Sequence, residues 1–202
     1  MGKIEDYKST IKSRPFLYLE TKKVANLINK GFNAFEIKEK TLKENIFQVK
    51  TEMRKKEIAS IIITRLKDLD LFLVEKIVKG DSDTSKIIVL YSIMKTDRLF
   101  FEFMYEVYRE KIILYDHYLT DKDFNLFFDI KKQQSSKVAS WNDYTFYKLK
   151  QVFIRIIYEA GLIKNQKGNR EINQIYIDLE VKQFIKDIGD QVYLEALVGE
   201  DL

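Results

Sequence analysis

The sequence predicts a mainly all-α protein that folds as a compact helical bundle. Its 202 residues include seven glycines and one proline, so few positions would interrupt a helix. Hydrophobic residues make up 46% of the chain, which is enough for a sizeable core. A fold of many strands would need more turn-forming residues than this chain has. We therefore expect one large helical domain or two small ones.

Apolar spacing predicts five helices in the first 95 residues. In each segment the apolar positions recur every three or four residues, as on one face of a helix. Pro15 and Gly31 delimit the first helix, because proline suits a first helical turn and glycine a helix end. The segment 31–69 consists of a short helix, a polar connection and a longer helix, which is a helix-turn-helix-like arrangement. The predicted helices cover residues 16–30, 33–40, 51–68, 70–79, and 81 or 83 to 94.

A further group of helices begins at Asp97. The segment that follows, RLFFEFMYEVYREKIIL, is apolar nearly all round, which places it at the centre of the core. Thr120 with Asp123 begins another helix, whereas Asn33, with Glu36 three residues later, begins the earlier helix 33–40 in the style of a capping box. The polar residues that we expect to cap helices are Asn33, Thr51, Asp97, Thr120, Asn142 or Asp143, and Asp178.

The polar stretch KKQQSSK at residues 131–137 is the best candidate for a domain boundary. We expect a helical domain at residues 1–134, which contains the segment 31–69, and a C-terminal unit at residues 135–202. Trp141 would be a packing anchor at the start of that unit.

The C-terminal unit has the pattern of a winged-helix domain with a small β-hairpin. A helix at residues 144–160 ends at Gly161 in a left-handed cap, with Leu162 and Ile163 folding back. A polar turn at 164–170 then leads into a predicted strand at 171–177. In a winged-helix domain a recognition helix is likewise followed by a hairpin with a basic tip. A helical hairpin that ends in a small structural ribbon has a similar pattern, and it stays open as an alternative.

Basic residues gather in two regions, although the net charge of +4 and the pI of about 8.9 show only a mild basic excess. The first region is the start of the predicted helix 51–68. Cations and free backbone N–H groups at such a position can contact phosphates. A helix N-terminus already carries partial positive charge, however, so a merely solvated face is the alternative. This cluster consists of Arg54, Lys55 and Lys56.

The second basic region belongs to the winged-helix-like unit. Lys148 and Arg155 lie on the polar stripe of helix 144–160, and Lys164, Lys167 and Arg170 lie in the turn that follows. Lysine is a point charge and not a bidentate reader of bases, so these residues predict phosphate contacts with little sequence readout.

Several function classes lack the residues that they need. The chain has no cysteine, which excludes disulfides, thiolate zinc sites and a cysteine nucleophile. Its one histidine, His117, is in a connection and makes neither a zinc site nor a Ser–His system by itself. The carboxylates Asp121 and Asp123 lie at a helix start, and no glycine-rich phosphate loop is present. We therefore expect no enzyme activity and no cofactor.

No membrane segment is predicted. The longest apolar run, at residues 87–94, is far shorter than the roughly 18 to 20 residues of a membrane span. The N-terminus has no apolar stretch typical of a secretory signal. A cytoplasmic protein is the expectation.

The order and spacing of short motifs resemble the BrxA family, the small NusB-like component of BREX phage-defence systems. That family was earlier labelled an inner-membrane protein, which this sequence does not support. The resemblance covers roughly residues 10 to 180. The matching positions, in order, are Gly31-Phe32, Phe35-Glu36-Ile37, Glu44-Asn45, Phe47, Arg54-Lys55-Lys56, Arg65-Leu66-Lys67-Asp68-Leu69, Asp97-Arg98-Leu99, Arg109-Glu110-Lys111, Trp141, Thr145, Leu149 and Glu159-Ala160-Gly161-Leu162.

The resemblance implies a NusB-like N-terminal part and a non-enzymatic accessory protein that binds double-stranded DNA beside other BREX components. Two alternatives stay open: a protein-interaction scaffold without nucleic-acid binding, and RNA binding, which the NusB likeness brings in. The oligomeric state is not predicted. The residues expected to contact nucleic acid are Arg54, Lys55, Lys56, Lys148, Arg155, Lys164 and Lys167.

Overall fold

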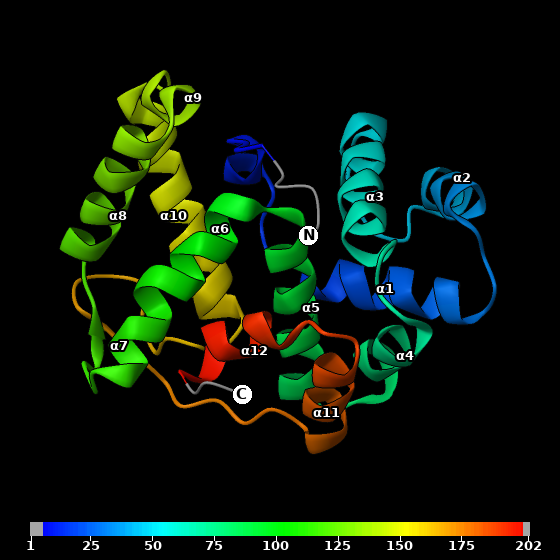
Figure 1. The fold of residues 1–202 in the computed structure, drawn as a ribbon. Coiled ribbons are helices and arrows are strands. Elements are labelled where there is room, and N and C mark those ends of the chain that lie inside the picture. The colour runs from blue at the N-terminus through cyan, green and yellow to red at the C-terminus, as the bar shows by residue number, and fades with distance from the viewer. Residues whose placement is uncertain (1–5, 200–202) are drawn as a thin grey trace. The chain divides into compact units, whose positions relative to one another are not determined.

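The computed structural model describes residues 6–199, which are mostly helical and belong to two compact units (Figure 1). The first unit combines Met1–Pro15 with Ile93–Leu202, and the second is Phe16–Ser92. The sequence-predicted boundary after residue 134 lies inside the first unit, between two consecutive helices, and that division stays a prediction. The mainly all-α fold with a small antiparallel pair of strands is confirmed.

The second unit is a group of helices in which α1 packs against α3 and α4, and α2 packs against α3 (Figure 1). Its core is aliphatic and includes Val24, Ile58 and Leu73, which are fully or almost fully buried. Arg65 is buried with them, and its guanidinium donates to the Phe16 carbonyl at 3.1 Å. The helices are α1 (Tyr18–Asn29), α2 (Ala34–Glu44), α3 (Glu52–Leu66), α4 (Leu71–Lys79) and α5 (Ser82–Thr96), which ends in the other unit.

The first unit is built around one long helical stretch, as the apolar segment after Asp97 predicts. Three elements follow each other without a break: α6 (Arg98–Phe103), the π-helical turn η2 (Met104–Tyr108) and α7 (Arg109–Ile113). The other elements are η1 (Thr10–Ser13), β1 (Tyr118–Leu119), α8 (Asp121–Gln134), α9 (Ser136–Ala139), α10 (Asp143–Glu159), β2 (Arg170–Glu171), α11 (Leu179–Asp187) and α12 (Gln191–Val198).

An aromatic cluster joins the central stretch to α8 and α10. The Phe103 ring stacks on Phe124 of α8 at 4.6 Å between centroids and lies 5.5 Å from Phe153 of α10. Phe128 of α8 contacts Phe146 of α10 at 5.4 Å. Aromatic pairs of this kind add about 0.5–1.5 kcal/mol each beyond the area that they bury. One side of α10 is therefore held firmly against the core.

Most of the predicted helix caps are confirmed. Asn33 and Glu36 form a capping box at the start of α2, and Thr120 and Asp123 form another at the start of α8. The side chains of Thr51, Asp97, Asn142 and Asp178 each accept a backbone N–H in the first turn of a helix.

The strands are shorter than predicted. Only Arg170 and Glu171 pair with β1, and Ile172 adds a single bridge to Ile163. The segment from Gln174 to Ile177 makes no ladder, because no strand of the described residues lies beside it. The C-terminal helix α12 was not predicted from the sequence. No helix of residues 6–199 is both long and apolar enough to span a bilayer.

A buried charge network supports the central stretch. The Lys131 ammonium, 2% exposed, pairs with Glu102 at 2.7 Å and with Glu106. Glu102 also accepts from Arg98 at 2.6 Å and from the Tyr7 hydroxyl at 2.8 Å. Burial would raise the pKa of Glu102, but the hydrogen bonds from Lys131, Arg98 and Tyr7 outweigh burial and lower it below its usual 4.5. The carboxylate therefore stabilises the fold above about that pH, and this contribution is lost as the pH falls through the lowered pKa.

The substitution Lys131→Ala should lower the free energy of unfolding by about 3–5 kcal/mol, because it leaves the Glu102 carboxylate buried without its ammonium partner. Urea unfolding at neutral pH measures the loss. The neighbouring Lys132→Ala is the control. Because Lys132 is 36% exposed and pairs with Asp129, this substitution should lower the free energy of unfolding by about 1 kcal/mol or less. Equal losses in the two variants would contradict a structural role for the network.

Candidate nucleic-acid interface

Helix α10 (Asp143–Glu159) presents a polar stripe on the side that faces away from the aromatic core. Side chains three and four residues apart share one side of a helix. The buried side is apolar except for Thr145, and the opposite side carries tyrosines, cations and one amide. The residues of this α10 stripe are Tyr144, Tyr147, Lys148, Gln151, Arg155 and Tyr158, all exposed except Lys148, which is half-buried.

Side chains of the stripe hold each other in place. The Lys148 ammonium lies over the rings of Tyr144 and Tyr147, 5.4 and 5.7 Å from their centroids. The Gln151 amide donates to the Tyr147 hydroxyl at 2.7 Å and accepts from Lys148 at 3.4 Å. Arg155 is paired through its Nε with Glu159, one turn further on. The stripe is therefore an ordered row of donors and not a set of free cations.

Gly161 turns the chain from α10 into the second part of the candidate interface. Its φ of +88° is in the left-handed region that favours glycine. The N–H groups of Gly161 and Leu162 donate to the carbonyls of Tyr158 and Ile157, which closes the helix as a Schellman motif. Leu162 and Ile163 fold back into the core, as the sequence predicts.

The following turn, residues 164–169, is braced from within by Asn165. Its amide nitrogen donates to the carbonyls of Lys167 and Asn169 at 2.7 and 3.1 Å, and its oxygen accepts from the Glu171 N–H. The Lys164 N–H also donates to the Glu171 carbonyl at 2.9 Å. These contacts give the turn a defined shape.

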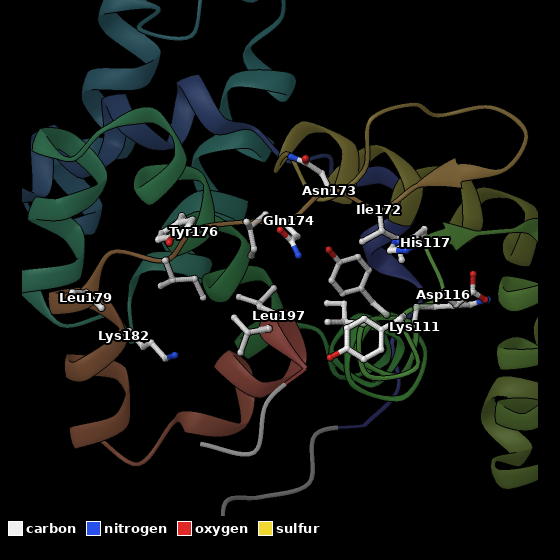
Figure 2. Close-up of a pocket in the computed structure, with 16 residues that line it drawn as sticks. Lys111, Asp116, His117, Ile172, Asn173, Gln174, Tyr176, Leu179, Lys182 and Leu197 are labelled. Carbon is white, nitrogen blue, oxygen red and sulfur yellow. The ribbon is translucent and has the colours of Figure 1, made fainter.

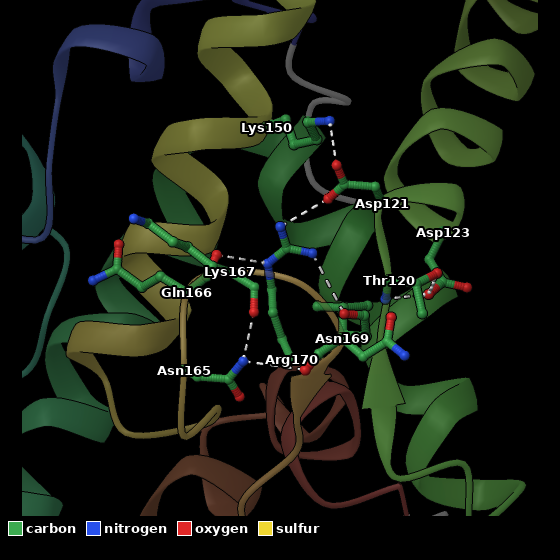
Figure 3. A network of polar contacts seen from close by, with 10 residues as sticks. Thr120, Asp121, Asp123, Lys150, Asn165, Gln166, Lys167, Asn169 and Arg170 are labelled. Atoms are coloured by element: carbon green, nitrogen blue, oxygen red, sulfur yellow. Dashed lines mark hydrogen bonds and ion pairs between the residues drawn. The ribbon is translucent and has the colours of Figure 1, made fainter.

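Arg170, which the sequence placed on the exposed turn with Lys164 and Lys167, is buried instead. The side chain is 5% exposed, and Figure 3 shows its guanidinium at the centre of a polar network. It donates to the Gln166 carbonyl at 3.1 Å and pairs with Asp121 at 2.7 Å, and Asp121 also accepts from Lys150 at 3.1 Å. Burial would raise the pKa of Asp121, but the hydrogen bonds from Lys150 and Arg170 lower it. Arg170 is therefore an anchor for the turn and not a contact residue.

Lys164 and Lys167 are both exposed on this turn but differ in their partners. The Lys164 ammonium pairs with Glu171 across the base of the turn. Within the described part of the chain, the Lys167 ammonium has no carboxylate partner. The structure thus brings four of the predicted residues together in one unit: Lys148 and Arg155 on α10, and Lys164 and Lys167 on the turn joined to it.

The other three predicted residues lie in the second unit, at the start of α3 (Glu52–Leu66). Arg54 pairs with Glu57 at 2.6 Å, and Lys56 lies 3.9 Å from Glu52. Lys55 donates to the Leu42 carbonyl at 3.4 Å. All three cations are therefore engaged within the unit.

His117 lies in the connection before β1, as predicted, and lines a groove of about 450 Å³ in the first unit (Figure 2). The walls of the groove come from α7, α11, α12 and the segment before α11, and most of them are apolar or aromatic. Tyr115, Tyr176 and Leu179 are its most exposed large side chains. Lys111, beside His117, is occupied by ion pairs with Asp116 and Asp123 at 2.7 and 2.9 Å. In residues 6–199 no group of three or more potential metal ligands lies together.

Two features of the candidate interface are not predicted from the sequence. The first feature is the presence of Tyr144 and Tyr147 beside the predicted Lys148. Their spacing of three and four residues from the other stripe residues could have identified them. The burial of Arg170 depends on Asp121, 49 residues earlier in the chain, and no local pattern reports such a contact.

Comparisons with known proteins agree over almost the whole chain. The BrxA family model matches residues 5–189. A curated relative from Bacillus cereus (strain H3081.97), described as "BREX protein BrxA", is 63% identical over 99% of this chain and its own full length. A second protein with that description, from Paramagnetospirillum magneticum (strain ATCC 700264 / AMB-1), is 21% identical over 95% of this chain and 96% of its own. The fold is similar to the crystal structure of an uncharacterized protein from Magnetospirillum magneticum, with a TM-score of 0.83, 21% identity, and coverage of 97% of this chain and 100% of that one.

The substitution Arg170→Ala should lower the free energy of unfolding by about 2–3 kcal/mol, because it removes charge-assisted hydrogen bonds from a buried site. Hydrogen exchange of the amides in residues 164–169 should become faster as the turn loosens. Arg170→Lys should restore only part of the stability, since an ammonium cannot supply the planar fork of donors. Lys167→Ala is the matched control on the same turn and should change stability by about 0.5 kcal/mol or less. Unchanged exchange in Arg170→Ala would show that the guanidinium does not anchor the turn.

Proposed function

The chain belongs to the BrxA family, and from that premise we propose that it is a double-stranded-DNA-binding accessory protein of a BREX-type phage-defence system. Its proposed role is non-enzymatic and cytoplasmic, without a cofactor, and its proposed partners are a DNA duplex and other BREX components. The proposed contacts are made mainly to phosphates. The proposed contact residues are Arg54, Lys55, Lys56, Lys148, Arg155, Lys164 and Lys167.

The observation that carries this proposal is the basic surface of α10 and the turn that follows it, which together carry four of the predicted cations in one unit. Four cations of this surface face two carboxylates, Glu159 and Glu171, which leaves a net charge of +2. Duplex DNA attracts such a surface through its phosphates, whatever the base sequence. Lysine provides three of the four cations, which fits contacts to phosphates better than bidentate contacts to bases.

The order of elements in the first unit also supports the proposal. Strand β1 is followed by the helices α8, α9 and α10, then by the bridge residue Ile163, the basic turn and strand β2. A winged-helix domain has the same general order, with its recognition helix in the place of α10 and its wing in the place of the turn. On this interpretation α10 would enter the major groove, which has the width to admit a helix.

The alternative function is a protein-interaction scaffold without direct nucleic-acid binding. The groove in Figure 2 favours it, because Tyr115, Tyr176 and Leu179 are large side chains left exposed beside an apolar wall. Exposed apolar surface of this kind is typical of sites that bind other proteins. RNA binding is a further alternative.

Binding to a labelled duplex, measured as salt is raised, tests the proposal. If about five phosphates are neutralised, log K should fall with log salt at a slope of about −4 to −5. Lys148→Ala and Lys167→Ala should each reduce the magnitude of the slope by about 1. Replacing Arg54, Lys55 and Lys56 with alanine should weaken binding to unrelated sequences about equally.

Three outcomes of that titration separate the alternatives. A flat salt dependence would contradict electrostatic DNA binding and favour the scaffold. Tighter binding to an RNA competitor than to the duplex would favour the RNA-binding function. A slope that changes only with the α3 residues would place the contacts in the second unit alone.

The substitution Glu159→Gln should strengthen binding to the duplex, because it removes the carboxylate that neutralises Arg155. The expected gain is roughly fivefold at low salt, since one unit-charge interaction at about 4 Å in water is worth about 1 kcal/mol. Glu75→Gln, which removes the acidic partner of Lys79 on α4, is the matched control and should leave affinity unchanged. Equal affinity of wild type and Glu159→Gln would remove Arg155 from the proposed interface.

A further inference from the structure

We propose that Gln151 recognises a base edge in the major groove, with adenine as its preferred base. This inference rests on the proposed binding of a DNA duplex, and it adds a sequence preference to a surface that otherwise contacts phosphates. It concerns one side chain, the amide at the middle of the α10 stripe.

The position of Gln151 separates it from the cations around it. It is the ninth of the 17 residues of α10, and its side chain is exposed. Lys148 lies one turn before it and Arg155 one turn after it on the same side of the helix. If the two cations contact phosphates, the side chain between them is the one directed at the floor of the groove.

The amide is held in a fixed orientation before any DNA binds. One N–H group of its nitrogen donates to the Tyr147 hydroxyl at 2.7 Å, and its oxygen accepts from Lys148 at 3.4 Å. A primary amide has two N–H donors and an oxygen with two lone pairs. Gln151 therefore keeps one donor and one acceptor position after both contacts are made.

A free donor beside a free acceptor is the chemistry that adenine requires. In the major groove adenine presents N7 as an acceptor and its N6 amino group as a donor, and glutamine and asparagine are the side chains that match both. Guanine presents two acceptors there and is matched by arginine or lysine. In this stripe Lys148 is held over two tyrosine rings and Arg155 is paired with Glu159, so the amide is the group best placed to select a base.

Tyr147 is a positioning residue in this proposal. Its ring is half exposed. Of the two hydrogen bonds that orient the Gln151 amide, the one to the Tyr147 hydroxyl is shorter than the one from Lys148. Tyr144 has a similar exposure and also lies under the Lys148 ammonium, but the hydrogen bond from Gln151 goes to the Tyr147 hydroxyl and not to that of Tyr144. The two tyrosines therefore form a matched pair, of which only one should affect base preference.

Selection from a library of duplexes with randomised positions tests the proposal, at a salt concentration at which the wild-type protein binds. The wild type should enrich adenine at one position or more, by about tenfold over the other bases. Gln151→Ala should abolish this enrichment and leave the salt slope unchanged. Gln151→Glu should shift the preference toward cytosine, because a carboxylate accepts from the cytosine N4 amino group. Since residue 151 is exposed, both variants should keep the wild-type thermal unfolding midpoint.

The tyrosine pair supplies the second arm of the experiment. Tyr147→Phe, which removes only the hydroxyl, should reduce the adenine enrichment without changing the salt slope, and Tyr144→Phe should change neither. A wild-type protein that binds duplex with a steep salt slope but enriches no base would overturn this inference and leave the proposed function intact. Enrichment that persists in Gln151→Ala would also overturn it. No duplex binding at any salt concentration would overturn both proposals.

Discussion

The burial of the Arg170 guanidinium is the constraint on which the C-terminal part of the candidate interface depends. A buried cation is tolerated only where its donors are satisfied, and breaking such a site by removing one partner is costly. Here the partners come from different places in the chain: Asp121 at the start of α8, the Leu119 carbonyl in β1, and the Gln166 carbonyl in the turn. Because one side chain bonds to all three, the strand, the helix start and the turn keep a fixed relation. The buried Arg170 therefore fixes the positions of the exposed cations of the turn, Lys164 and Lys167.

Charge pairing governs what the exposed surface can do. Arg155, Lys164 and Arg54 each have a carboxylate partner within their own unit. Exposed pairs of this kind contribute little to stability, typically 0–1 kcal/mol, so a phosphate can replace the carboxylate at small cost. In a chain this rich in lysine, the number of cations is a poor guide to an interface. The cations that have no carboxylate partner among the described residues are a better guide to an interface, and on the turn 164–169 that cation is Lys167.

Much of the fold could be predicted from the sequence, because most of its determinants are local. The capping box of Asn33 and Glu36 and the left-handed Gly161 involve residues within a turn of each other, and these predictions were confirmed. The predicted strand 171–177 was too long, because strand length is set by a partner distant in sequence, and β1 offers only two residues. The burial of Arg170 is non-local for the same reason. For the candidate site, the spacing of residues on α10 was predictable, but the contacts that orient Gln151 depend on rotamers that no spacing reports.

Helix α10 serves the core and the candidate interface at once, and its periodicity keeps the two roles apart. Phe146, Leu149 and Phe153 face the aromatic cluster, whereas the stripe around Gln151 faces away from it. The rings of the core fix the rotation of α10 about its axis, and that rotation decides which side chains reach outward. Side chains of the stripe bond mainly to each other, so substitutions among them remove contacts on the outside without opening a cavity inside. A change in DNA preference caused by such a substitution would therefore report the chemistry of the contact and not a loss of the fold that carries it.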